Sequence, residues 1–323
     1  MRKDNKPNLL VTAPTYFISE IENEVGKYFN ATYAYDFSKS QVSEVIEGID
    51  AWILDPGATY RIDDEILQYN NSLKIIVTPS TGSDHVDLEL LKSRNIEFDS
   101  LKGKEEIIAN IHASAEFSFT LLMSMIRKLV PAVNYAKMGH WRDKEDELRG
   151  IELNGKTLGI IGYGRIGKKM ANYATAFGSK IMVYDPYVNV ESDEIIQVDQ
   201  IERLLSTSDI VSVHVHLEES TRNLISTEEF NLMKRPVYFL NTARGGIVDE
   251  DAMMHALSEG DFFAAIDVIS GEQSDDLSNH KLIKFAQKNK NLIISPHIAG
   301  ATVDSQYKAA KFAVDRIRNF YGK

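Results

Sequence analysis

Residues Thr157–Gly167 read Thr-Leu-Gly-Ile-Ile-Gly-Tyr-Gly-Arg-Ile-Gly, an apolar run that enters a G-x-G-x-x-G pattern. A helix is expected next, because the apolar residues that follow recur with helical spacing. In such a strand–turn–helix unit, Gly162 permits the tight turn, Gly164 lets a phosphate approach the backbone, and Gly167 lets the helix pack on the strand. The helix N-terminus offers N–H groups to the phosphates. The stretch therefore predicts a dinucleotide-binding βαβ unit.

The next apolar run, Lys180–Tyr184, ends in Asp185, 18 residues after Gly167. A carboxylate at this place can accept hydrogen bonds from both ribose hydroxyls, and it repels a 2′-phosphate. No arginine follows within Asp185–Asn189 to offset that repulsion. We therefore predict NAD rather than NADP as the cofactor. The alternative is a structural glycine-rich turn, with Asp185 as a solvated strand end.

Apolar runs alternate with helical patterns on both sides of this stretch. Phe17–Phe29 has apolar residues at every fourth position, as an amphipathic helix does. Strands are expected before the glycine motif at Leu9–Ala13, Ala51–Leu54 and Lys74–Thr78, and a second series of six is expected at Thr157–Ile161, Lys180–Tyr184, Ile210–Val215, Val237–Asn241, Phe263–Val268 and Leu292–Ser295. Such alternation implies parallel sheets covered on both faces. The predicted fold class is α/β, with two doubly wound parallel sheets.

A different pattern separates the two series. Lys104–Met138 reads as a long helical stretch, Gly139–Gly150 as a polar surface loop, and Ala301–Phe320 as one closing helix. Phe117–Val130 is the most apolar longer stretch, but a membrane helix needs about 20 mainly apolar residues, so a buried helix is expected there. Met1–Asn8 is polar, which predicts no secretory segment and a cytoplasmic location.

The composition is that of an ordinary globular protein. The 323 residues are 43% apolar and 26% charged, and this length favours two domains. The 36 basic and 47 acidic side chains give a net charge of −11, which excludes a diffuse attraction for nucleic acid or anionic membranes. The absence of cysteine excludes disulfides, thiolate nucleophiles and zinc–cysteine sites.

Polar residues follow the strands of the second series, where open parallel sheets bind their ligands. Arg244 can hold a carboxylate through two parallel N–H bonds, and His297 can exchange a proton near neutral pH. Glu272 can orient the imidazole and favour its charged form. Each has a structural alternative: a strand-end cap for Arg244, a solvated loop acid for Glu272 and a buried histidine for His297. Spacing alone favours the solvated alternative for Glu272.

A second pair of histidines, His214 and His216, ends another predicted strand. Residues two apart on a strand share a face, but the sequence shows no third ligand beside them. We therefore predict no metal site. The roles of His216 and of His112 stay open.

Five ordered motifs resemble those of the D-isomer-specific 2-hydroxyacid dehydrogenases. The resemblance is clearest over Ala109–Thr302 and looser over the rest of the chain. The motifs are Leu153-Asn-Gly-Lys-Thr-Leu-Gly-Ile-Ile-Gly-Tyr-Gly-Arg-Ile-Gly167, Tyr184-Asp-Pro186, Asn241-Thr-Ala-Arg-Gly-Gly-Ile-Val-Asp249, Ala265-Ile-Asp-Val268 and Ser295-Pro-His-Ile-Ala-Gly300.

The resemblance implies specific roles. Arg244 would bind the substrate's carboxylate and carbonyl, His297 would be the general acid/base, and Glu272 would pair with it. Together with the glycine motif, it implies cofactor contacts at Gly162, Gly164, Arg165, Ile166, Gly167, Asp185, His214, Thr242, Ala243, Asp267 and Gly300, and substrate contacts at Ser80, Thr81, Gly82 and Arg244.

The resemblance also implies the domain organisation. Residues 1–104 and 300–323 would form a discontinuous, flavodoxin-like substrate domain, and residues 105–299 a larger Rossmann NAD-binding domain. Family members pair through the cofactor domain, so a homodimer is predicted near Phe117–Val130 and the loop that carries Trp141.

The chain departs from the family pattern at several positions. Gln273 follows Glu272 where proline is usual, His216 replaces the proline of a His-Val-Pro turn, and the turn at Thr78–Gly82 lacks the usual arginine and first glycine. Asp55 stands where phosphoglycerate dehydrogenases carry an arginine, which disfavours a phosphorylated substrate.

These observations predict an NAD-dependent oxidoreductase that interconverts a small D-2-hydroxy acid and its 2-oxo acid by hydride transfer. One alternative is an NAD(H)-sensing corepressor of the same fold, which would keep the motifs without turnover. Another is an enzyme of the same fold that acts on formate or phosphite.

Overall fold

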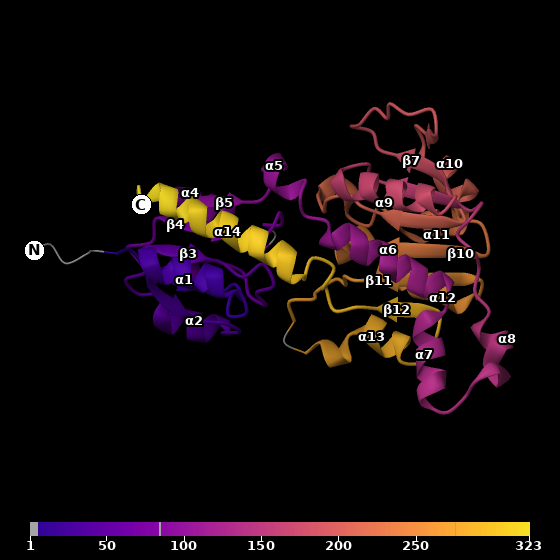
Figure 1. Cartoon of the computed structure of the whole chain (residues 1–323), viewed down its shortest axis with the longest axis horizontal. Coiled ribbons are helices and arrows are strands. Elements are labelled where there is room, and N and C mark those ends of the chain that lie inside the picture. Colours follow the sequence, from indigo (N-terminus) through magenta and orange to yellow (C-terminus); the bar gives the residue numbers. More distant parts are fainter. Residues whose placement is uncertain (1–5, 84, 275) are drawn as a thin grey trace, which may run out of the picture. The chain divides into compact units, whose positions relative to one another are not determined.

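The computed structural model describes residues 6–83, 85–274 and 276–323. The chain divides into two compact units (Figure 1). Unit 1 takes Met1–His112, Gln273–Asp275 and Ala301–Lys323, and unit 2 takes Ala113–Glu272 and Asp276–Gly300. Each unit has its own parallel sheet with an apolar cluster on either face. The predicted α/β fold with two parallel sheets is confirmed.

Unit 1 contains a five-stranded parallel sheet in the order β2-β1-β3-β4-β5. Its strands are β1 (Asn8–Val11), β2 (Asn30–Tyr33), β3 (Ala51–Ile53), β4 (Ile75–Thr78) and β5 (Glu97–Ser100). The three predicted strands form the fully buried centre, apart from the exposed Asn8 at the start of β1. The other two, β2 and β5, are the outer strands and were not predicted. Both contain polar residues that are partly exposed, so they lack the continuous apolar run that indicates a central strand.

The described residues of unit 1 form six helices. They are α1 (Ser19–Tyr28), α2 (Lys39–Val45), α3 (Asp64–Leu67), α4 (Leu88–Ser93), α5 (Glu105–Ile108) and α14 (Val303–Phe320). The closing helix α14 lies beside α1 and packs on β3 and β4 (Figure 1). It begins two residues later than predicted, because the Thr302 hydroxyl accepts the Ser305 N–H and caps the helix there.

Unit 2 contains a seven-stranded parallel sheet in the order β12-β11-β10-β9-β6-β7-β8. Its strands are β6 (Thr157–Ile161), β7 (Lys180–Tyr184), β8 (Ile195–Gln197), β9 (Ile210–Val213), β10 (Val237–Asn241), β11 (Phe262–Ile266) and β12 (Leu292–Ile294). All six predicted strands are present, but the predicted number is wrong by one, because β8 is a short outer strand without a buried run. The order is that of a Rossmann sheet, whose ligand-binding switch point lies between β6 and β9.

The helices of unit 2 correct two further predictions. They are α6 (Ala113–Ile126), α7 (Leu129–Lys137), α8 (Glu145–Leu148), α9 (Arg165–Ala176), α10 (Ile201–Thr207), α11 (Thr227–Leu232), α12 (Glu250–Ser258) and α13 (Lys281–Ala286), with 3₁₀ turns η1 (Arg142–Lys144), η2 (Glu219–Thr221), η3 (Gly245–Ile247) and η4 (Leu277–Asn279). The predicted long helix over Lys104–Met138 is broken, partly because Lys128 adopts a left-handed backbone with φ 51° between α6 and α7. The predicted loop at Gly139–Gly150 contains η1 and α8.

Candidate active site

The glycine motif forms the turn between β6 and α9. Gly162 has φ +91°, and a Cβ on it would lie 2.8 Å from the backbone of His214. A Cβ on Gly167 would lie 2.2 Å from the carbonyl oxygen of Gly162, so only glycine allows α9 to approach the strand this closely. A Cβ on Gly164, the N-cap of α9, would have no atom within 4 Å. The first turn of α9 therefore opens on free space, and this cradle fits a pyrophosphate.

Asp185 lies against the same turn. Its carboxylate accepts the backbone N–H of Tyr163 at 2.7 Å and that of Tyr187 at 2.9 Å. These two bonds fix the carboxylate at the carboxyl end of β7, beside the glycine turn. Each oxygen has a second lone pair, so the group can still accept from the hydroxyls of a ribose.

His214 follows β9 on the other side of the switch point. Its Nε2 lies 2.7 Å from the buried Ser212 hydroxyl, and burial lowers the pKa of His214 to about 3. The ring is therefore neutral at physiological pH. The backbone of His214 packs against Gly162, so His214 lies beside the glycine turn between β6 and α9. Within residues 6–83, 85–274 and 276–323 there is no cluster of three or more side chains suited to hold a metal ion.

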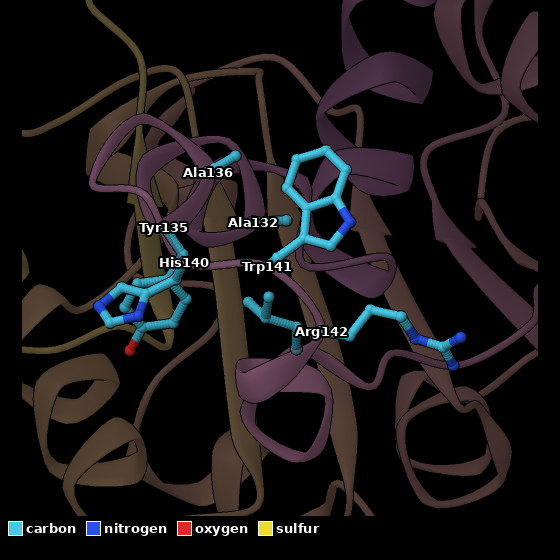
Figure 2. Close-up of a pocket in the computed structure, with 7 residues that line it drawn as sticks. Ala132, Tyr135, Ala136, His140, Trp141 and Arg142 are labelled. Carbon is cyan, nitrogen blue, oxygen red and sulfur yellow. The ribbon is translucent and has the colours of Figure 1, made fainter.

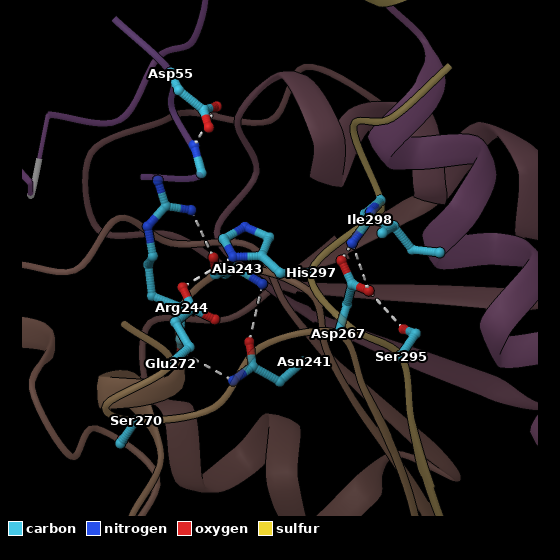
Figure 3. Close-up of polar contacts among 12 residues, drawn as sticks. Asp55, Asn241, Ala243, Arg244, Asp267, Ser270, Glu272, Ser295, His297 and Ile298 are labelled. Carbon is cyan, nitrogen blue, oxygen red and sulfur yellow. Dashed lines mark hydrogen bonds and ion pairs between the residues drawn. The ribbon is translucent and has the colours of Figure 1, made fainter. Parts of the chain in front are cut away.

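The turn after β10 is folded by the side chain of Asn241. Its Oδ1 accepts the Ala243 N–H at 3.0 Å, and its Nδ2 donates to the Arg244 carbonyl at 3.0 Å (Figure 3). The guanidinium of Arg244 donates to the Ala243 carbonyl at 2.8 Å. Thr242 is buried, and its hydroxyl pairs with Ser118 of α6 at 2.7 Å. That bond anchors the turn, so the Thr242 hydroxyl serves the fold here.

The turn after β12 is organised by Asp267, which is only 1% exposed. Its carboxylate accepts the Ser295 hydroxyl at 2.5 Å, the Ile298 N–H at 3.1 Å and the Ala299 N–H at 2.8 Å (Figure 3). Its backbone carbonyl accepts the His297 N–H at 2.8 Å. Asp267 thereby holds His297 in a left-handed backbone with φ 53°. The predicted contact of Asp267 with a nicotinamide stays a prediction.

His297 and Glu272 are paired. The imidazole Nδ1 lies 2.9 Å from Glu272 Oε1, and the two side chains are 46% and 20% exposed. Glu272 is thus held by a partner, although its polar loop had favoured a solvated acid. Arg244, Glu272 and His297 follow the adjacent strands β10, β11 and β12, and Figure 3 shows them gathered at one place. The pair leaves Nε2 of the ring for a reacting group, and Arg244 adds a fixed positive charge.

Unit 1 carries the predicted substrate turn after β4. The Ser80 hydroxyl donates to the Gly82 carbonyl at 3.1 Å, and the Leu101 N–H donates to the Ser80 carbonyl at 2.8 Å. Asp55 follows the neighbouring strand β3 and accepts the Gly57 N–H at 2.9 Å. Burial, together with the charge of Asp36, raises the pKa of Asp55.

Sequence reasoning missed several residues that hold this site. Asn241, Ser295 and Ser118 carry no chemistry of their own. The partners of Ser295 and Ser118 are distant in sequence, and Asn241 acts on the backbone of the turn that follows it. A polar residue at a buried strand end was the one available signal, and Asn241 shows it. The predicted trio nevertheless lies together, supported by buried hydrogen bonds, and its catalytic roles stay a prediction.

A family model described as "D-isomer specific 2-hydroxyacid dehydrogenase, NAD binding domain" matches residues 119–299. The chain belongs to the D-isomer-specific 2-hydroxyacid dehydrogenases. The resemblance predicted from the motifs is therefore confirmed, and with it an NAD-dependent oxidoreductase with a Rossmann domain.

The dehydrogenase aligns over most of its length with relatives of named activity. A hydroxypyruvate reductase of Thermotoga maritima is 33% identical over 280 residues, which are 86% of this chain and 87% of the relative. A glyoxylate reductase of Thermofilum pendens is 36% identical over 261 residues, 79% of this chain and 74% of the relative. The crystal structure of a D-lactate dehydrogenase from Aquifex aeolicus with NAD and lactic acid is 27% identical, with a TM-score of 0.78 and coverage of 97% and 95%. None of the described helices of the dehydrogenase is long and apolar enough to cross a membrane.

Proposed function

We propose that this dehydrogenase interconverts a small, unphosphorylated D-2-hydroxy acid and its 2-oxo acid, with His297 as the general acid/base. The 2.9 Å contact between His297 and Glu272 carries the proposal, because it aims an imidazole whose other nitrogen stays available for the substrate. Bound NADH would supply the hydride that reduces the substrate's C2.

The three side chains have different tasks in reduction. The Arg244 guanidinium binds the substrate carboxylate and polarises the carbonyl at C2. Protonated His297 donates its Nε2 proton to the carbonyl oxygen, which becomes the hydroxyl. Glu272 stabilises the imidazolium and keeps the ring in one orientation. Oxidation of the hydroxy acid reverses these steps, with neutral His297 accepting the proton.

The names of the relatives and the carboxylate of Asp55 in unit 1 support the proposed substrate class. A hydroxypyruvate reductase, a glyoxylate reductase and a D-lactate dehydrogenase are named for acids of two or three carbons. We propose that residues 1–104 and 300–323 serve as the substrate domain and residues 105–299 as the NAD-binding domain, with Ser80, Thr81 and Gly82 over the substrate carboxylate. Asp55 then disfavours a phosphate at the far end of the substrate by repulsion.

A panel of 2-oxo acids with NADH tests the function. Glyoxylate, pyruvate and hydroxypyruvate should be reduced, whereas phosphohydroxypyruvate and 2-oxoglutarate should react much more slowly. The loss of NADH absorbance measures each rate. Tight NADH binding without turnover of any acid would instead support the NAD(H)-sensing alternative, which the enzyme relatives do not favour. A cytoplasmic location stays a prediction.

Asp185 should select NAD over NADP. In Asp185→Ser, NADP should gain relative to NAD, because the repulsion of the 2′-phosphate disappears with the carboxylate. Measurement of kcat/KM for both cofactors checks this, and the exposed acid Asp193 supplies the matched control, Asp193→Ser. Unchanged discrimination in Asp185→Ser would refute the ribose contact.

We also propose a homodimer formed through the surface of α7 and the following loop. Large apolar side chains are exposed there, namely Leu129, Val130, Val133, Met138 and Trp141, of which Trp141 is 79% exposed. Beside them is a hollow of about 150 Å³ lined by Ala132, Tyr135, Ala136, His140, Trp141, Arg142 and Leu148 (Figure 2). An apolar surface of this kind is typical of a contact with another protein, and a second copy is the partner we propose.

Sedimentation velocity tests the dimer. The wild-type enzyme should sediment as a dimer, and Trp141→Lys should shift it toward monomer, because a charge would be buried in the contact. Tyr187→Lys changes an aromatic side chain that is 89% exposed elsewhere on unit 2 and should leave the dimer intact. A monomeric wild-type enzyme would overturn this part of the proposal.

A further inference from the structure

Glu250, the first residue of α12, is a buried acid that the proposed chemistry does not use. Its side chain is 6% exposed. Its Oε1 accepts the backbone N–H of Ser270 at 2.6 Å, and its Oε2 lies 3.6 Å from His280 Nε2. A carboxylate is costly to bury without partners, so the interior position of Glu250 indicates that these contacts matter to the fold or to the site.

His280 holds the next peptide along the chain, between Ser270 and Gly271. Its Nδ1 accepts the Leu282 N–H at 3.3 Å at the start of α13, which leaves the proton on Nε2. That Nε2–H donates to the Ser270 carbonyl at 3.0 Å. Ser270 is thus held by its N–H through Glu250, the first residue of α12, and by its C=O through His280, the N-cap residue of α13.

The turn that carries Arg244 packs on the Ile269–Ser270 peptide, the one whose N–H donates to Glu250. A Cβ on Gly245 would lie 2.1 Å from the carbonyl carbon of Ile269 and 2.3 Å from the nitrogen of Ser270. Gly245 directly follows Arg244, and Glu272 lies two residues after Ser270. One peptide unit therefore connects the backbone that carries the guanidinium with the loop that carries the carboxylate partner of His297.

We propose that Glu250 is a positioning residue for Glu272. By fixing the Ser270 peptide, it keeps the Glu272 carboxylate within reach of His297 Nδ1 and maintains the packing of Gly245 beside Arg244. The loop around Glu272 has few fixed points of its own. Gly271, between Ser270 and Glu272, has φ +71°, and Gln273 and Ser274, which follow Glu272, are exposed. An anchor at Ser270 therefore matters to the position of Glu272. This proposal rests on the proposed function, since it concerns the same His297–Glu272 pair.

The test compares Glu250→Ala with Glu250→Gln. Alanine removes the acceptor of the Ser270 N–H, so kcat/KM should fall by about 10²-fold, as expected when a catalytic group is displaced by about 1 Å. Glutamine keeps an oxygen acceptor and should restore most of the activity. Asp251→Ala is the matched control, because Asp251 is the next acid on α12 and pairs with the surface residue Lys281 at 2.7 Å.

Two further readouts separate positioning from general destabilisation. The pH profile of kcat/KM in Glu250→Ala should move in the direction that Glu272→Gln moves it, and Glu250→Ala should cost little more in the Glu272→Gln background. A lower Tm with an unchanged pH profile, or losses that multiply in the double variant, would overturn the proposal.

A measurement without turnover keeps this proposal distinct from the function. The ring-nitrogen NMR shifts of His297 should move in Glu250→Ala toward their values in Glu272→Gln. Shifts that stay at the wild-type values would overturn the positioning role. Failure of the wild-type enzyme to reduce any 2-oxo acid would overturn the proposed function, while the NMR comparison still decides the role of Glu250.

Discussion

Arg244→Ala should abolish the reduction of small 2-oxo acids while leaving NADH binding nearly unchanged. The guanidinium is the fixed positive charge beside His297, and a carboxylate bound through two parallel N–H bonds depends on it (Figure 3). Removal of one partner of such a charge pair costs roughly 4 kcal/mol, so kcat/KM should fall by about 10³-fold. Arg244→Lys keeps the charge but not the planar guanidinium, so its kcat/KM should lie between those of the wild type and Arg244→Ala.

Steady-state kinetics and NADH titration of the same preparations measure these effects. Arg203→Ala, which removes an exposed arginine of α10, is the matched control and should behave as wild type. If Arg244→Ala lost NADH binding and turnover together, Arg244 would belong to the cofactor site and the assigned role would be wrong.

The second large effect is expected at His297. His297→Gln keeps a polar side chain of similar length but cannot exchange a proton, so kcat should fall by about 10²- to 10⁴-fold. The wild-type rate of 2-oxo acid reduction should decline as pH rises, because reduction needs the imidazolium, and the rate of hydroxy acid oxidation should rise instead. Both dependences should flatten in His297→Gln.

Rates of both directions across a pH series check this assignment. His255→Gln is the matched control, because His255 of α12 is 70% exposed and pairs only loosely with Glu259 at 3.7 Å. Glu272→Gln should show a smaller loss than His297→Gln, since the general acid/base is still present. A pH profile of His297→Gln that matched the wild type would assign the proton transfer to another group.

The central strands were predictable because burial on both faces demands continuous apolar runs. Each predicted strand of both sheets is present, whereas β2, β5 and β8 were missed since an outer strand can be short and polar. The break between α6 and α7 was missed although Pro131 lies in the first turn of α7, where proline is tolerated, because Lys128 is an ordinary residue in an uncommon backbone conformation.

The candidate site likewise contains residues that could be predicted from the sequence and residues that could not. Arg244, Glu272 and His297 could be predicted to lie together because a reactive side chain at the carboxyl end of a strand points to chemistry, and because the motifs resemble a known family. The side chains that hold them were not found. Asn241 and Glu250 act through backbone groups, and a backbone N–H or C=O leaves no mark in a sequence.

The left-handed backbone of His297 implies a trade between durability and activity. A residue other than glycine in this region of φ costs about 1 to 2 kcal/mol of folding stability. Asp267 holds His297 there, because its carboxylate accepts three hydrogen bonds from the adjoining turn and its backbone carbonyl accepts the His297 N–H. Selection for heat resistance alone would favour glycine at position 297. Histidine at this strained position is what the proposed role of His297 in proton transfer leads us to expect.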